Sequence, residues 1–418
     1  MKKSYSKWSK KESISQQAQL ELVSVKHFVQ RELREFVVSA GMTALSAMLE
    51  DERTAICGPR YAHATKREAY RGGHTRGELV LGGRRVSVLR PRARGLDGHE
   101  HELPSWKQFS GADPLHARAL EQMLVGVSTR KYARSLEDVP TATRGTSKSP
   151  VSRRFVEITK EKMAELFGRD LSGIDLAVVM LDGVHISDHV ILVALGIDTA
   201  GEKHVLGIRE GATENATACT ELLTQLRERG MSTEKTTLFV LDGGKALKKS
   251  VVDVFGKRAK IQRCQVHKLR NVLDQLPEYM RPSVKSVLQQ AYACGNVVHA
   301  RKLLTNLMRT LKTDHPSAAA SVEEGLEETL TVMAMKLPRT LERIFSTTNA
   351  VENLMGSVRD LSRRVKHWKN GEMVVRWTTT AVLEAGKRFR RIRGHKAMPQ
   401  LVRALRALEA VEMKENTA

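Results

Sequence analysis

The chain carries VVMLDG at residues 178–183 and LFVLDG at residues 238–243. Each stretch is an apolar, β-prone run that ends in the same Leu-Asp-Gly triplet. Runs of this length and composition are typical of buried strands. Asp-Gly pairs also form ordinary turns and helix starts. Asp182 and Asp242 are therefore either turn residues or two carboxylates, each held at the end of a buried strand.

The elements around these two runs predict how the strands are ordered. Apolar runs and helical spacing predict strands over 174–181, 189–197, 203–208, 236–241 and 260–264, and helices over 213–229 and 245–255. The first three strands can form an antiparallel meander, and the later strand–helix units must lie parallel beside it. This succession describes a ribonuclease-H-like α/β core, in which Asp182 and Asp242 can lie side by side.

Two carboxylates that approach each other in apolar surroundings repel unless a cation lies between them. Mg²⁺ and Mn²⁺ take oxygen ligands and tolerate such a geometry. Two such ions about 4 Å apart can activate the attacking oxygen and stabilise the leaving oxygen in phosphodiester chemistry. The sequence therefore favours a metal site with Asp182 and Asp242 as ligands over the interpretation of the two aspartates as unrelated turn residues.

A third acidic ligand is expected on a helix that packs against the sheet, and Glu352 is the best candidate. It lies in FSTTNAVENLM, residues 345–355, where a hydroxyl residue at 346–348 can cap the helix. Asn349 and Glu352 then share one helix face. Arg359 follows two turns later on the same face, placed to hold a DNA phosphate. The alternative is that Glu352 is a plain surface residue, although its neighbours are neutral or apolar.

The charge of the chain narrows the class of partner. Its 418 residues contain 69 Lys and Arg against 47 Asp and Glu, a formal net charge of +22. This surplus points to a polyanion such as double-stranded DNA, because each cation that neutralises a phosphate releases counterions. Four scattered cysteines without a CxxC pair favour a reducing, intracellular setting. With no apolar run near the ~20 residues of a membrane span, we expect a cytoplasmic protein.

Four basic stretches are candidate DNA contacts. The first decorates a Gly-rich hairpin predicted around Gly82-Gly83. The second opens a helix predicted to begin at Ser149-Pro150, which suits a recognition helix in the major groove or else a generic helical hairpin. The others are a pair near the end of the Glu352 helix, which is predicted over roughly 347–366, and the basic run 386–396, whose alternative is a solvated helix end. The predicted contacts are Arg84, Arg85, Arg90, Arg92, Arg153, Arg154, Arg363, Arg364, Lys387, Arg388, Arg390 and Arg391.

Changes in composition and in the spacing of apolar residues along the chain predict six regions. A helical region over 1–60 and a small β-rich basic unit over 61–112 precede a helical, helix-turn-helix-like region over 113–170, with one helix opening at Ser128. The α/β core follows in two parts, 171–265 and 344–418, separated by a helical insertion over 266–343. The second part contains the Glu352 helix and a final helix over 373–391.

These motifs resemble those of the IS256-type transposases, the bacterial relatives of the Mutator group, over nearly the full length. The matching stretches are CGPRY (57–61), GGRRV (82–86), LDG (181–183), LDGG (241–244), RCQVHK (263–268) and TTNAVE (347–352). The resemblance implies an Asp, Asp, Glu triad at Asp182, Asp242 and Glu352 that binds Mg²⁺ or Mn²⁺, two ions in all. It also implies a functional basic residue at Arg359 and an all-helical insertion before Glu352.

The same resemblance identifies Cys264 and His267 as a C-x2-H pair. Two ligands cannot complete a four-coordinate zinc site, and no second pair is visible at suitable spacing. We therefore expect His267 to hydrogen-bond near the scissile phosphate, or the pair to pack at the base of the insertion. A satisfied core histidine is the alternative. His185, close after Asp182, is a weaker candidate on similar grounds.

The resemblance implies a DNA transposase that binds terminal inverted repeats through its N-terminal half. It would cleave the ends with metal-activated water, and the freed 3′-hydroxyl would attack target DNA. Paired ends imply at least a homodimer, working in the bacterial cytoplasm on the nucleoid. Two alternatives stay open: another ribonuclease-H-like nuclease of the junction resolvase type, and a DNA-binding regulator without catalysis.

Overall fold

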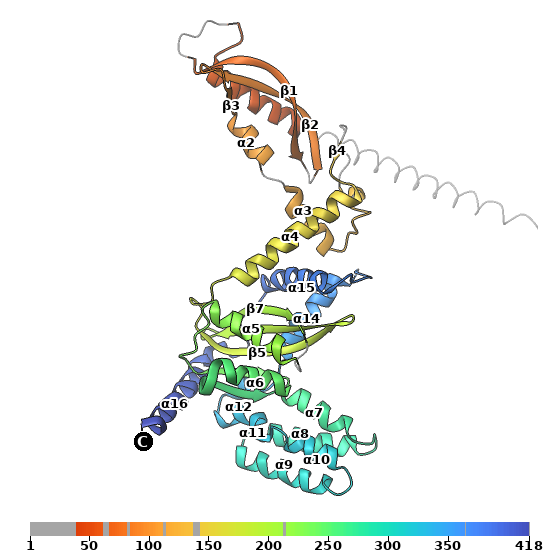
Figure 1. The fold of residues 1–418 in the computed structure, drawn as a ribbon, viewed down its shortest axis with the longest axis vertical. Helices are drawn as coiled ribbons and strands as arrows, with labels where there is room; N and C mark the ends of the chain where they lie inside the picture. The colour runs from red at the N-terminus through yellow and green to blue at the C-terminus, as the bar shows by residue number, and fades with distance from the viewer. Residues whose placement is uncertain are drawn as a thin grey trace, which may run out of the picture. The chain divides into compact units, whose positions relative to one another are not determined.

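The computed structural model describes residues 39–61, 67–81, 84–111, 114–136, 143–211, 215–363 and 365–417. The chain divides into two compact units, residues 1–158 and residues 159–418, and Figure 1 labels their elements. The apolar residues between Leu20 and Val37, for which the sequence predicts helix, lie outside the described residues. Residues 39–57 are helical.

The first unit contains a small antiparallel sheet built on a long hairpin. Strand β1 (Ala69–Leu81) pairs with β2 (Arg84–Gly95), and Leu81 lies opposite Arg84 as the predicted hairpin requires. Gly82 and Gly83 themselves lie outside the described residues. Strands β3 (Glu100–His101) and β4 (Thr143–Arg144) both pair with β2. Leu79 and Ala93 pack with Leu49 of the helix and with Trp106 of helix α2 (Pro104–Gly111).

The helical part of the first unit differs from the prediction. Helix α3 (Pro114–Leu124) is followed by turns and the 3₁₀ helix η1 (Ala133–Ser135), so the helix expected to open at Ser128 is absent there. Gly126 has a positive φ of 97°, a conformation that ends helices rather than starting them. Helix α4 (Lys148–Gly168) has Pro150 in its first turn, within two residues of the predicted start.

The second unit contains a five-stranded mixed sheet with the order β7-β6-β5-β8-β9. Strands β5 (Leu176–Ile186), β6 (His189–Asp198) and β7 (Lys203–Glu210) form the expected antiparallel meander. Strands β8 (Thr237–Leu241) and β9 (Ala259–Arg263) continue the sheet in parallel with β5. The fold is therefore mixed α/β, and β5 lies at the centre of the sheet where both pairing modes meet.

Helices cover both faces of this sheet (Figure 1). Helices α5 (Ala216–Glu228) and α6 (Lys245–Phe255) bury Leu222 and Val251 against one face. Helices α14 (Asn349–Ser362), α15 (Gly371–Gly386) and α16 (Met398–Thr417), with the 3₁₀ helix η3 (His395–Ala397), bury Met355 and Leu401 against the other. Side chains alternate between the two cores along β5, as the period of two demands.

The segment between β9 and α14 is helical. The helices are α7 (Gln265–Asp274), α8 (Arg281–Ala293), α9 (Val297–Leu311), α10 (Pro316–Glu323), α11 (Leu326–Thr329), α12 (Thr331–Ala334) and α13 (Arg339–Phe345), while the 3₁₀ helix η2 (Gly256–Arg258) precedes β9. Helices α7–α10 share a core of their own around Leu288 and Leu304. In Figure 1 they gather to one side of the sheet.

Two predictions at the C-terminal end were wrong in extent. Helix α15 ends at Gly386 rather than continuing to Arg391, so most of the basic run 386–396 lies in a loop. The prediction also omitted α16, whose Met398, Leu401 and Leu405 are buried at helical spacing. The spacing of these apolar residues in the sequence is typical of a helix, although they directly follow the basic run 386–396.

Candidate active site

The sheet brings the two Leu-Asp-Gly triplets together. Strands β5 and β8 are parallel, with Leu181 opposite Leu241, so Asp182 and Asp242 follow at the same edge of the pairing. The sequence predicts that Asp182 lies at the end of its strand, but the structure shows otherwise. Asp182 lies inside β5 opposite Val193 of β6, and β5 continues to Ile186 because β6 pairs with it throughout. What ends at Asp182 is the parallel pairing with β8.

The backbone around Asp242 is a tight turn that only glycine can follow. Gly243 has a φ of 110°, and a Cβ there would collide with the Arg263 guanidinium. The Asp242 Oδ1 atom accepts a hydrogen bond of 3.0 Å from the Gly244 backbone N–H. Arg263 itself is buried and held by Glu324 through its carbonyl and carboxylate. The second triplet thus does turn the chain, and its aspartate also faces the site.

Glu352 lies in the first turn of α14. The N-cap of this helix is Thr348, whose side chain makes no hydrogen bond to the helix backbone. Instead its backbone N–H and its hydroxyl both point to the Sγ atom of Cys264, at 3.4 and 3.6 Å. Cys264 follows β9 and its own N–H donates to the Leu241 carbonyl at 2.7 Å. Cys264 therefore links the strand before Asp242 to the helix that carries Glu352.

His267 completes a compact group of ligand atoms. One atom each from Asp182, His267 and Glu352 lie within 4.8 Å of one another. The His267 Nε2 atom is 3.8 Å from Glu352 Oε1, and Arg270 of α7 approaches the same oxygen at 3.6 Å. Asp242 stands outside this group of three, although it is close enough to influence the pKa of Asp182 and of His267.

Electrostatics in the site reflect the crowding of carboxylates. Asp182 is only 4% exposed, and burial raises its pKa from the ordinary 3.8 to about 6. The negative charges of Asp242 and Glu352 contribute to this rise of the pKa, while His267 and a hydrogen bond from Thr348 oppose it. The ionised form of Asp182 is therefore short of positive charge in this arrangement.

Cys264 and His267 shift each other's pKa in opposite directions. The Cys264 sulfur is the main cause that raises the pKa of His267 to about 9, and Asp182 and Asp242 raise it too. Burial would raise the pKa of the Cys264 thiol, but His267 more than offsets it, so the net shift is downward. His267 thus carries a positive charge beside the carboxylates at neutral pH, which sets it apart from a neutral core histidine.

Sequence reasoning missed two residues of this site. Arg270 contacts Glu352 from one turn after His267, and Thr348 lies between the Cys264 sulfur and Asp182. The i, i+3 spacing of His267 and Arg270 was the available signal for Arg270. His185, the weaker candidate, is exposed near the far end of β5 and is not among the residues grouped here.

The residues predicted around Glu352 are exposed on α14 or directly after it. Arg359 is exposed in the last turn of α14, and Arg363 is exposed just beyond it. Asn349 is exposed at the first helical position, where it lines a groove beside the helix. Arg364 lies outside the described residues.

The hairpin arginines have partners that the sequence did not reveal. Arg90 and Arg92 both bind the Glu100 carboxylate of β3, and Arg85 lies 3.7 Å from Glu78 of β1. No acid intervenes between these arginines along the chain, but the neighbouring strands supply two. The side chain of Arg84 lies outside the described part.

The other predicted DNA contacts are mostly exposed. On α4, Arg153 is exposed and Arg154 is partly buried. Lys387, Arg388, Arg390 and Arg391 are exposed in the loop after α15. Lys387 pairs with Glu384 at 2.6 Å and Arg391 with Glu202 at 2.7 Å.

The arrangement of strands, helices and carboxylates invites comparison with known proteins. The family model described as "Transposase, Mutator family" matches residues 11–391. This chain belongs to the Mutator family of transposases. Its membership agrees with the resemblance to IS256-type enzymes that the motifs indicated.

Curated relatives of this Mutator-family chain are insertion sequence transposases. It is 27% identical over 358 residues to the ISRM5 transposase of Rhizobium meliloti (strain 1021), covering 84% of this chain and 87% of that one. It is 25% identical over 395 residues to the IS905 transposase of Lactococcus lactis subsp. lactis (strain IL1403), covering 90% and 96%. The IS256 transposase of Tn4001 from Staphylococcus aureus is 25% identical over 341 residues, covering 78% and 84%.

None of the helices in the described part of this Mutator-family chain is long and apolar enough to cross a membrane.

Proposed function

We propose that this Mutator-family protein is a DNA transposase that cleaves the ends of its insertion sequence and joins them to target DNA. The observation that carries the proposal is that Asp182 of β5 and Glu352 of α14 have ligand atoms within 4.8 Å of each other, while Asp242 directly follows β8, the strand paired in parallel with β5. Three carboxylates from separate elements, in a basic chain, suit metal-dependent phosphodiester chemistry. We assign the mixed sheet and its helices to a ribonuclease-H-like core, with 265–345 as its helical insertion.

The donor set fits hard divalent cations, magnesium in particular. Asp182, Asp242 and Glu352 offer oxygen ligands, and the raised pKa of Asp182 marks a place where additional positive charge would be stabilising. Two ions held by these residues would activate the attacking oxygen and stabilise the leaving oxygen.

The surrounding cations act on the DNA and on the carboxylates. The His267 Nε2 atom is 3.8 Å from Glu352 Oε1. The imidazolium can therefore donate a hydrogen bond to a phosphate oxygen beside Glu352. Arg270 orients the Glu352 carboxylate from the same helix. Arg359, exposed two turns beyond Glu352, is placed to hold a neighbouring phosphate. Hydrolysis and strand transfer are both in-line displacements, so one carboxylate set can serve both.

Binding of the terminal inverted repeats is assigned to the N-terminal half. The exposed Arg153 on α4 and the arginine-bearing hairpin are its candidate contacts, together with Arg363 and the loop after α15 in the C-terminal half. Because insertion joins two ends at one target, we propose that the active form is a homodimer or a larger assembly. The DNA substrate places this activity on the bacterial nucleoid.

The test is nicking of inverted-repeat duplex DNA with Mg²⁺ by Asp182→Asn, Asp242→Asn and Glu352→Gln. We expect each variant to lose nicking by at least about 100-fold, as removal of a metal ligand would. Asp253→Asn, which changes an exposed acid on α6, is the matched control and should nick like the parent. If all three variants nick as well as that control, the assigned site is wrong.

Strand transfer separates the proposed activity from its alternatives. A transposase joins the cleaved 3′-hydroxyl end to a second duplex, whereas a junction resolvase cleaves branched DNA without joining it. Tight repeat binding by the parent with no Mg²⁺-dependent or Mn²⁺-dependent nicking would instead identify a regulator.

A further inference from the structure

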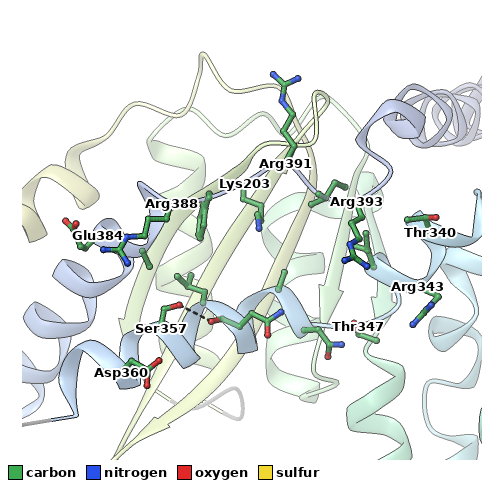
Figure 2. A pocket seen from close by; sticks show the side chains of 18 of the residues that line it. Lys203, Thr340, Arg343, Thr347, Ser357, Asp360, Glu384, Arg388, Arg391 and Arg393 are labelled. Carbon is green, nitrogen blue, oxygen red and sulfur yellow. Dashed lines mark hydrogen bonds between the residues drawn. The ribbon is translucent and has the colours of Figure 1, made fainter. Parts of the chain in front are cut away.

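A groove of about 1020 Å³ lies beside α14, and Glu352 is not among the residues that line it. Its walls are α13, α14, the end of α15 and the loop 387–393, with β7 contributing Lys203 (Figure 2). Asn349 and Asn353 are one turn apart on the α14 wall. Glu352 precedes Asn353 by one residue, about 100° around the helix. The groove is therefore separate from the carboxylate cluster and adjoins it across one helix.

Positive charge dominates this groove. Six basic side chains line it against two acidic ones. Lys203, Arg343, Arg388 and Arg393 make no ion pair or side-chain hydrogen bond with any described residue. Figure 2 shows Lys203, Arg388 and Arg393 around the middle of the groove. Like charges gathered without partners repel one another, which favours a polyanionic ligand between them.

The remaining lining is apolar and includes an aromatic ring. Ile344, Leu354 and Phe389 line the groove among the charged groups. The Lys203 Nζ atom lies 5.0 Å from the centroid of the Phe389 ring, and burial lowers the pKa of Lys203. Phosphate ions alone would gain nothing from this apolar part. Nucleotides would, because their bases stack on aromatic rings while cations hold the backbone.

The size of the groove favours an unpaired strand over a duplex. Pockets that enclose one drug-sized molecule run to about 1000 Å³, so this groove admits on the order of two or three nucleotides. In a duplex the faces of the bases are covered by their neighbours, and exposing them costs a few kcal/mol per base. Only a strand that is already unpaired can reach Phe389 without that cost.

We propose that this groove binds a short single-stranded DNA segment next to the reacting phosphodiester. The inference rests on the proposed transposase function, since only a strand end freed by cleavage can separate from its complement beside Glu352. Lys203, Arg343, Arg388 and Arg393 hold its phosphates, Phe389 stacks on a base, and Asn349 and Asn353 offer hydrogen bonds along α14. The strand passes from the carboxylates around the N-terminal end of α14 into the groove.

The first experiment locates the strand by photo-cross-linking. Repeat-end duplexes with a four-nucleotide single-stranded extension of 5-iodouracil are irradiated with the full-length protein in EDTA, and the linked peptide is identified by mass spectrometry. We expect linkage to residues 387–393, which contain Phe389. Linkage confined to other segments, in repeated trials, would overturn the proposal.

The second experiment measures affinity for the extended duplex and for its blunt counterpart by fluorescence anisotropy. The Arg343→Ala/Arg393→Ala variant should lose at least tenfold in affinity for the extended DNA but less than threefold for the blunt DNA. Its salt slope for the extension should fall by about 1.4, that is 0.7 per single-strand phosphate contact. Lys302→Ala/Arg309→Ala removes the same charge from exposed positions of α9 and should change both affinities less than twofold.

A third variant distinguishes a single strand from other anions. Phe389→Leu keeps every charge and should weaken binding of the extension by roughly tenfold, as loss of one stacking contact does. Equal losses for extended and blunt DNA would identify a duplex site. Release of the extension by micromolar pyrophosphate would identify a small-anion site. Either result would overturn the proposal.

All these measurements are made without metal, so they do not depend on cleavage. If Asp182→Asn nicks normally but the groove variants behave as expected, the active-site assignment fails and the groove stands. If the parent nicks and joins DNA but the groove variants bind the extension like the parent, only the groove fails.

Discussion

Asp182 carries the largest electrostatic cost among the three carboxylates of the site. It is buried inside β5 with Asp242 and Glu352 as negative neighbours, and its pKa is raised to about 6. A carboxyl whose pKa is higher in the folded state destabilises the fold when it ionises. Stability is therefore lost as the pH rises from about 4 through 6. The shift of about two pKa units corresponds to at most about 3 kcal/mol.

Asp182→Asn should therefore stabilise the protein in EDTA while it abolishes nicking. We expect the variant to unfold at a higher denaturant concentration than the parent at pH 8, by up to about 3 kcal/mol. The difference should shrink below pH 6 and vanish only below pH 4, as Asp182 becomes protonated in the unfolded state as well as in the folded one. Urea unfolding across this pH range measures it. A gain that is as large at pH 4 as at pH 8 would show that burial of the charge is not its cause.

Residue types and spacing point to Asp182, Asp242 and Glu352 as candidate ligands, but they do not indicate the contacts around them. Asp182, Asp242 and Glu352 could be chosen because each interrupts an apolar or neutral stretch with an acid. The link from Cys264 to Thr348 spans 84 residues of sequence. Nothing local in either stretch requires it. Such a contact depends on how α14 packs against the end of β9, which no periodicity encodes.

At the scale of elements, the start of α14 is held in an unusual way. The N-cap N–H of a helix is often satisfied by a Glu or Gln side chain at the third helical position. Here Val351 occupies that position and cannot accept a hydrogen bond, so the Cys264 sulfur accepts from the Thr348 N–H instead. Glu352, one position later, is left free to face Asp182 and His267. We therefore predict that Cys264 positions Glu352.

Cys264→Ala should impair cleavage more than folding. Loss of a helix cap costs about 1 kcal/mol, whereas a displacement near 1 Å at a reacting centre can cost about 100-fold in rate. We expect a 10- to 100-fold lower nicking rate with a nearly unchanged KM for the DNA. Cys264→Ser, which keeps an acceptor, should recover part of the rate.

The matched control for this prediction is Cys294→Ala, which removes a less buried cysteine after α8. It should nick like the parent. Parent-like rates for Cys264→Ala, or a rise in KM alone, would exclude the positioning role.

Elements were predictable from sequence where apolar residues repeat regularly. The strands of the mixed sheet and α5 and α6 have such repeats, and they occur in the structure in the predicted order. Strand β5 runs five residues beyond the predicted end because β6 supplies hydrogen-bond partners as far as Ile186. The residue at which a strand ends therefore depends on how far its partner strand extends. The segment after Ser128 forms turns and the 3₁₀ helix η1 in place of the expected α-helix, and Gly126 before it has the left-handed backbone that follows the end of α3.

At the scale of the whole molecule, the number of basic residues overstates the positive charge that is available to DNA. The chain contains 69 Lys and Arg, but several of its arginines already pair with acids from neighbouring elements. Counterions leave DNA when a basic side chain neutralises a phosphate. An arginine that is already paired with a carboxylate must break that pair before it can do so. The footprint on DNA should therefore follow the unpaired cations rather than the total.

Arg153 and Arg92 test this distinction, because the sequence predicts both as DNA contacts. Arg153 is exposed on α4, whereas Arg92 donates two hydrogen bonds to Glu100. Affinity for inverted-repeat duplex is measured between 50 and 300 mM salt by anisotropy. Arg153→Ala should reduce the slope of log K against log salt by about 0.9, one phosphate contact. Arg92→Ala should change the slope by less than half of that, since its loss also frees the Glu100 charge. Equal slope changes would mean that pairing with Glu100 does not keep Arg92 from binding DNA, and the total number of basic residues would then be the better guide.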